Sequence, residues 1–158
     1  MLPYQVVVEE YLDDHGDSPF AAWFAELDAR AAAKVTVAVS RSAEGSRPEG
    51  RRCVMALTRS FKETVKARVA SDPAFKEALL TEGLNALLEG DLDTGKAVLR
   101  DYINATVGFE ALAEATGTPA KSLMRMFGTR GNPNASNLFA VIRHLQQASG
   151  VTLEVRAA

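Results

Sequence analysis

The chain has 158 residues, of which 47% are apolar and 24% are charged, and its formal net charge is −2. These values indicate a folded, soluble protein with one ordinary domain or two small ones, and they exclude an intrinsically disordered chain. No apolar run is long enough to span a membrane, the first residues lack the basic start of a signal peptide, and the single cysteine excludes an internal disulfide. We therefore expect a cytoplasmic protein with no membrane partner.

The first 42 residues predict one strand followed by two helices. A run of β-branched and apolar residues predicts the strand at residues 4–9. Ser18 and Pro19 suit the cap and the first turn of a helix, and Asp28 can cap a second helix. A segment of about 40 residues cannot bury its own apolar side chains. We therefore expect it to pack on the rest of the chain, within one subunit or across a dimer.

Residues 43–54 predict a linker, because Ser, Gly, Pro, Glu and Arg replace the periodic apolar pattern there. Residues 55–158 then predict a helical domain, whose first helix is expected from Thr58. Its inward-facing residues are expected to be Phe75, Leu79, Leu80, Leu84, Leu87, Leu88, Val98, Leu99, Tyr102, Ile103, Leu138, Val141, Ile142 and Leu145. The alternating tail, residues 151–157, predicts a short strand whose partner could be the same strand of a second subunit. The expected fold is therefore mainly α, a helical bundle with a short C-terminal strand, preceded by a small strand–helix–helix segment.

Residues 109–128 predict a helix-turn-helix within this bundle. A short amphipathic helix ends at Gly117, which can take the left-handed conformation of a tight turn, and Pro119 suits the first turn of a second helix. Ala113 is small enough for the two helices to approach each other closely. The expected buried face consists of Leu112, Leu123, Met126 and Phe127. The second helix of such a motif enters the major groove of DNA.

The residues expected to face DNA lie on the turn, on the second helix and on the loop that follows it. Arginine can bind guanine through two hydrogen bonds, serine can bond to several bases, and alanine or methionine can contact a thymine methyl group. Arg130 and the amides near Asn134 and Asn137 could hold a phosphate. The expected DNA-binding residues are Thr118, Ala120, Lys121, Ser122, Met124, Arg125, Arg130, Asn134 and Asn137.

The charge pattern supports the same interpretation. Between Glu114 and Glu154 the sequence contains no carboxylate but four cations, Lys121, Arg125, Arg130 and Arg143. A local field of one sign attracts a polyanion even when the net charge is near zero. Two alternatives remain open: a helix pair that does not bind DNA, and a solvated face that lacks acids by chance.

No group of residues suggests catalysis or metal binding. Cys53 lies in the predicted linker without a histidine partner, His15 lies in a polar turn, and His144 lies beside an apolar stripe. We therefore expect no catalytic residues, no metal and no cofactor.

Residues 55–156 resemble the HigA-like helix-turn-helix antitoxins of bacterial addiction modules. The stretch GKAVLRDYINATVGFEALAEATGTPAKSLMRMFG, residues 95–128, is the most specific part of this resemblance. The resemblance implies a dimeric antitoxin that binds operator DNA of its own operon and neutralises a partner toxin.

Residues 1–41, which include YQVVVEEYLDDHGDSPFAAWFAELDARAAAKVTVAVSR, resemble the start of the RelE/HigB-like toxins. Those toxins are ribosome-dependent ribonucleases whose catalytic basic residues lie on later strands, which this sequence lacks. The resemblances therefore imply a truncated toxin segment joined to a complete antitoxin, without ribonuclease activity. The expected function is that of a sequence-specific DNA-binding regulator. The alternative is a protein-interaction module that binds a RelE/HigB-like toxin but no operator.

Overall fold

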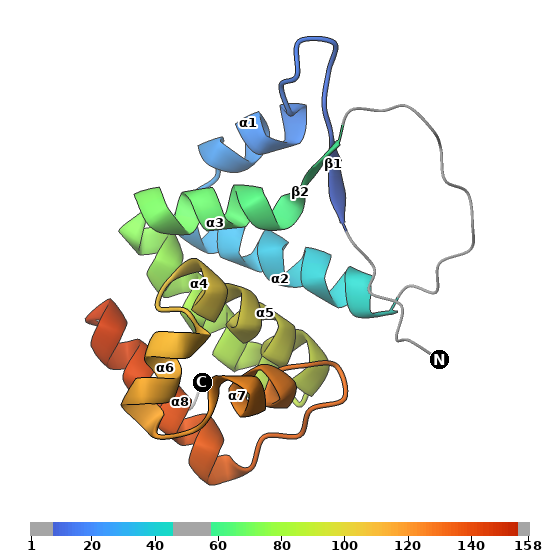
Figure 1. Cartoon of the computed structure of the whole chain (residues 1–158). Coiled ribbons are helices and arrows are strands. Elements are labelled where there is room, and N and C mark those ends of the chain that lie inside the picture. Colours follow the sequence, from blue (N-terminus) through green and yellow to red (C-terminus); the bar gives the residue numbers. More distant parts are fainter. Residues whose placement is uncertain (1–7, 46–57, 155–158) are drawn as a thin grey trace.

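The computed structural model describes residues 8–45 and 58–154, and within these ranges it contains eight helices and one two-stranded antiparallel sheet (Figure 1). The elements are β1 (Glu9–Tyr11), α1 (Pro19–Glu26), α2 (Ala29–Gly45), β2 (Thr58–Ser60), α3 (Phe61–Ser71), α4 (Pro73–Leu88), α5 (Leu92–Ala105), α6 (Phe109–Thr116), α7 (Ala120–Met126) and α8 (Ala135–Ser149). The prediction of a mainly helical fold that begins with a strand and two helices is confirmed. In Figure 1, α1 lies at one end of the molecule and α6, α7 and α8 at the other, with α2 to α5 between them.

Several helix starts follow from side chains that cap free backbone amides. The hydroxyl of Ser18 accepts a hydrogen bond from the Ala21 amide at 3.0 Å and so caps α1. A carboxylate oxygen of Asp28 accepts from the amides of Arg30 and Ala31 at 3.0 Å each, before α2. The predicted caps of the first two helices are therefore confirmed.

The sheet joins the N-terminal segment to the chain after residue 58. Strand β1 pairs with β2 so that Glu9 lies opposite Ser60 and Tyr11 opposite Thr58. Thr58 therefore belongs to a strand, and the prediction that it starts a helix is wrong by three residues, because the backbone groups of β1 need a partner. The strand predicted at residues 4–9 is observed at Glu9–Tyr11, and residues 1–7 lie outside the described ranges.

The structure describes only residues 43–45 of the predicted linker, residues 43–54. Residues 43–45 form the end of α2, so the helix extends beyond the expected boundary. Residues 46–57, which include the rest of the predicted linker, lie outside the described ranges.

One hydrophobic core runs through both parts of the chain. Helix α2 packs against α4 and α5, and Phe24 of α1 is buried in the same cluster. The expectation that the N-terminal segment packs on the rest of the chain is confirmed, with the contacts made within a single subunit. The core consists of Phe24, Ala32, Ala33, Val37, Phe61, Val65, Val69, Phe75, Leu79, Leu80, Val98, Leu99, Tyr102, Ile103, Phe109, Leu112, Leu123, Phe127, Val141 and Leu145.

Leu88 is a wrong assignment within the predicted core. The residue is 68% exposed, because α4 ends there and the chain turns away through Gly90, which has a φ of +86°. Leu84, Leu87, Leu138 and Ile142 are partly buried, so the remaining inward positions follow the predicted stripes.

The C-terminal strand prediction is also wrong for the residues that can be described. Residues 151–154 form no strand. The Val151 amide donates to the main-chain oxygen of Gln146 at 3.1 Å, and the Leu153 amide donates to the side-chain Oε1 of Gln146 at the same distance. The tail thus satisfies these two backbone donors on the last turns of α8, without a partner strand. Residues 155–158 lie outside the described ranges.

Candidate nucleic-acid interface

Helices α6 and α7 form the predicted helix pair. The residues 117–119 connect them, and Gly117 takes the left-handed conformation with a φ of +67° and a ψ of 14°. A side chain at this position would be strained, so the glycine is what allows the turn. Leu112 of α6 and Leu123 of α7 are fully buried, as is Phe127 after the second helix. Together with the partly buried Met126, they form the expected inner face.

The outer face of α7 carries the predicted base-reading residues. Lys121, Met124 and Arg125 are exposed, and Thr118, Ala120 and Ser122 are partly exposed. Lys121 and Arg125 are four residues apart and therefore lie on the same side of the helix. Neither forms an ion pair with any carboxylate in residues 8–45 or 58–154. Their positive charges are available to a ligand from solvent.

The loop after α7 brings Arg130 to the surface and ends in a cap for α8. The side-chain oxygen of Asn134 accepts a hydrogen bond from the Asn137 amide at 2.8 Å. The side-chain nitrogen of Asn137 donates to the sulfur of Met126 at 3.5 Å. These two asparagine side chains therefore already have partners inside the chain, whereas Arg130 is exposed and has no ion-pair partner among the described residues.

Lys96 of α5 is a buried residue that supports this surface from beneath, and it is not among the residues predicted from the sequence. Its side-chain nitrogen donates to the main-chain oxygen of Gly131 at 2.8 Å and lies 3.0 Å from a carboxylate oxygen of Asp93, although the residue is only 7% exposed. Its spacing indicates burial, because position 96 lies three residues before Leu99 and seven before Ile103, on the apolar stripe of the helix. A lysine on such a stripe requires polar partners from another element.

Gly131 explains why this loop lies so close to α7. A Cβ atom at this position would overlap the main-chain oxygens of Arg125 and Met126. Only glycine permits the loop to pass directly over the last turn of the second helix. No pattern in the sequence indicates that Gly131 approaches the main-chain oxygens of Arg125 and Met126.

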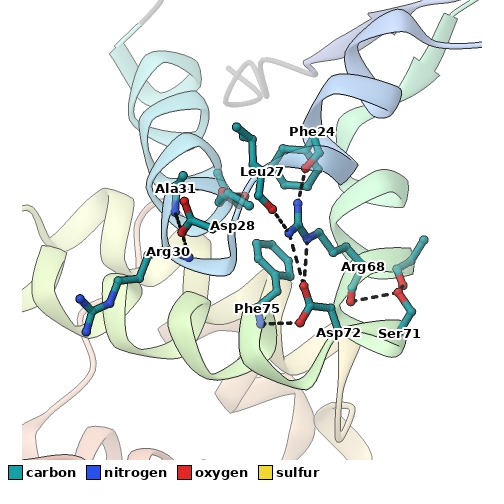
Figure 2. Close-up of polar contacts among 12 residues, drawn as sticks. Phe24, Leu27, Asp28, Arg30, Ala31, Arg68, Ser71, Asp72 and Phe75 are labelled. Carbon is teal, nitrogen blue, oxygen red and sulfur yellow. Dashed lines mark hydrogen bonds and ion pairs between the residues drawn. The ribbon is translucent and has the colours of Figure 1, made fainter.

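The N-terminal half contains a second group of charged residues, around a cavity of about 550 Å³ between α1 and α3. Arg68, which lines it, already donates to the main-chain oxygens of Phe24 in α1 and of Leu27 directly after α1, and to Asp72 (Figure 2). Arg59 lies 3.3 Å from the buried carboxylate of Glu10 and donates to the hydroxyl of Thr64 at 3.2 Å. Because these cations serve the fold, the exposed cations of α7 and its loop are the stronger candidate for a ligand surface.

No family model, no curated protein and no solved structure matches the chain. Within the described ranges, no three histidine, cysteine or carboxylate residues lie close enough together to hold a metal ion. No helix in these ranges is long and apolar enough to cross a membrane.

Proposed function

We propose that this protein is a sequence-specific, double-stranded-DNA-binding transcriptional regulator of antitoxin type, which acts in the cytoplasm on the operator of its own toxin–antitoxin operon and has no catalytic activity. Lys121, Ser122, Met124 and Arg125 face the bases of the major groove. Arg130 contacts a phosphate beside them.

The observation that carries this proposal is the placement of Lys121 and Arg125. They are exposed, one turn apart and without acidic partners among the described residues, on the second helix of a pair closed by a left-handed glycine. This is the arrangement that a recognition helix requires, since its outward side chains must be free to reach base edges. The long acid-free interval adds an attractive field for the phosphate backbone.

A two-fold symmetric operator is read by two copies of such a helix, so the proposal includes a homodimer. Phe139 of α8 is 66% exposed and offers an apolar contact for the second copy.

The second candidate is a protein-interaction module that binds a RelE/HigB-like toxin without binding an operator. The observation that favours it is Trp23 of α1, which is 46% exposed and whose ring centroid lies 5.4 Å from that of Phe20. Exposed aromatic residues are enriched at the centres of protein interfaces. Because α1 belongs to the toxin-like segment, a toxin would have to dock beside that segment.

Fluorescence anisotropy with a labelled duplex from the region upstream of the gene separates the two candidates. The full chain, Arg125→Ala, and Arg143→Ala as a matched control on α8 are titrated at about 50 mM and about 200 mM salt, because phosphate contacts make binding steeply salt-dependent. We expect Arg125→Ala to lose about 1–3 kcal/mol of binding free energy if the arginine reads a guanine. Arg143→Ala should retain the preference for the operator over a scrambled duplex.

Equal, weak binding of the operator and scrambled duplexes would contradict the DNA-binding proposal. Binding of a RelE/HigB-like toxin by the same sample, lost in Trp23→Ala, would then support the interaction module instead.

A further inference from the structure

Lys96 connects the buried core to the exposed loop that follows α7. Its ammonium group lies 2.8 Å from the main-chain oxygen of Gly131 and 3.0 Å from a carboxylate oxygen of Asp93. Only 8% of the Lys96 side chain is exposed, whereas 64% of the Asp93 side chain is. A buried ammonium group is costly unless it is paired and hydrogen-bonded, so these two contacts hold Lys96 in one place.

The contact continues from Gly131 into the last turn of α7. The Gly131 amide donates to the Gly128 oxygen at 2.9 Å, and the Gly128 amide donates to the Arg125 oxygen at 3.1 Å. In addition, a Cβ atom at Gly131 would overlap the main-chain oxygens of Arg125 and Met126, so no side chain fits there. Lys96 thus holds a glycine that is itself seated on the end of the second helix.

Through Gly131 and Lys96, the backbone at Arg125 and Arg130 is connected to α5 in the core. Arg125 belongs to the turn on which Gly131 rests, and Arg130 directly precedes Gly131 in the loop that Lys96 holds. Helix α5, which carries Lys96, packs against α4 and against α2 of the N-terminal segment. The helix pair is therefore fixed to the body of the protein at a point close to the proposed DNA contacts.

We propose that Lys96 is a positioning residue for DNA recognition, which sets the place of Arg125 and Arg130 through Gly131 without touching DNA itself. This inference rests on the proposed function, because it assigns Lys96 to the same DNA surface. Hydrogen bonds to base edges require accurate placement of the side chain, whereas long-range attraction to phosphates does not. Loss of the Lys96 contact should therefore reduce binding to the operator more than binding to unrelated DNA.

The test compares the full-length protein with Lys96→Met, Lys96→Arg and the control Lys66→Met. Lys66 is an exposed residue of α3 without an ion-pair partner in the described ranges. Amide hydrogen exchange is measured on the free protein, and anisotropy is measured with an operator duplex and a scrambled duplex. In Lys96→Met we expect exchange at Gly128 and Gly131 to accelerate by about tenfold, while the Leu80 amide in the core of α4 keeps its protection.

We expect operator affinity to fall by about tenfold in Lys96→Met and scrambled-duplex affinity to change by less than about twofold, so that specificity is lost. Lys96→Arg keeps the charge and the donor, and it should recover most of the preference for the operator. If Lys96→Met does not fold, Asp93→Asn, which removes only the ion pair, should show the same pattern with smaller changes.

Unchanged amide exchange at Gly128 and Gly131 in Lys96→Met and in Asp93→Asn would overturn the inference, whatever the DNA results. Operator affinity equal to that of the wild-type protein, despite faster exchange, would overturn it as well. Absence of operator binding by the wild-type protein would refute the proposed function, and the exchange data would still decide whether Lys96 positions the loop.

Discussion

The guanidinium group of Arg68, on α3, donates a hydrogen bond to the main-chain oxygen of Phe24, the buried aromatic residue of α1 (Figure 2). It also donates to the main-chain oxygen of Leu27 at 2.5 Å and lies 3.3 Å from the carboxylate of Asp72. Its central carbon lies 5.1 Å from the ring centroid of Phe24 and 4.9 Å from that of Phe75. One arginine therefore satisfies carbonyl groups at the end of α1 that have no partner within the helix.

We expect Arg68→Met to lower the free energy of unfolding by about 3 kcal/mol, because it leaves the partly buried carbonyl groups of Phe24 and Leu27 and the Oδ2 atom of Asp72 without this donor. Urea unfolding followed by circular dichroism measures this change. Arg68→Lys should recover only part of the loss, since an ammonium group cannot match the planar arrangement of several acceptors. A loss no larger than that of the control Lys66→Met would contradict the role assigned to Arg68.

Gly95 allows α4 and α5 to pack closely. A Cβ atom at this position would overlap the Leu87 side chain, with its γ-carbon at 2.6 Å, and would lie 3.1 Å from the Leu87 main-chain nitrogen. We expect Gly95→Ala to destabilise the protein by about 1–3 kcal/mol, as overpacked cores do. The double variant Gly95→Ala/Leu87→Ala should be more stable than the sum of the single effects, and simple additivity in a double-mutant cycle would refute this contact.

The helices that could be predicted are those whose signals are local. Ser18 and Asp28 cap the helices that directly follow them, and the apolar stripe of α5 has the spacing of a single helix. Such patterns depend only on neighbouring residues, so they can be read without knowing the fold. The prediction that Leu88 faces inward is wrong because it used only the apolar stripe, and the stripe does not show that the helix ends at this residue.

What could not be predicted depends on contacts between distant residues. Strand β2 forms because β1 lies beside it, although residues 12–57 lie between Tyr11 and its register partner Thr58. The roles of Arg68 and Lys96 likewise depend on main-chain oxygens of other elements, which no side-chain pattern marks. For the candidate DNA surface, the exposed residues of α7 could be predicted from helical periodicity, but the support beneath them could not.

The pair formed by Arg41 and Asp91 should contribute stability that depends on acid pH. Burial raises the pKa of Asp91, but hydrogen bonds from Arg41 and Thr94 and the charge of Arg41 outweigh it, so the pKa lies below its ordinary value of 3.8. A lowered pKa means that the stabilisation is present above 3.8 and is lost as the pH falls through the lower value of the folded state. The pair is partly exposed, with an N–O distance of 2.6 Å, so we expect less than about 1 kcal/mol from it.

Asp91→Asn isolates this effect, because asparagine caps a helix about as well as aspartate and the cap on Thr94 should remain. The variant should be less stable than the wild-type protein near pH 7 and equally stable near pH 2. Thermal unfolding at both pH values measures the difference. A difference that persists at the acid end would mean that the carboxylate charge is not its source.

The buried hydroxyl of Tyr102 should make stability depend on alkaline pH. It lies 2.6 Å from the hydroxyl of Ser149, and burial raises the pKa of Tyr102 above its ordinary value of 10.0, although the hydrogen bond with Ser149 acts in the opposite direction. Because the folded state favours the neutral phenol, the stabilisation is complete below pH 10.0 and declines as the pH rises through the raised pKa of the folded state.

We expect Tyr102→Phe to be less stable than the wild-type protein by about 1 kcal/mol near pH 8, through loss of the hydrogen bond, and to lose less stability as the pH rises. Urea unfolding across the alkaline range tests this, with Ser149→Ala as the control that removes the partner but keeps the phenol. Parallel pH profiles for the wild-type protein and Tyr102→Phe would show that this phenol does not ionise with a raised pKa.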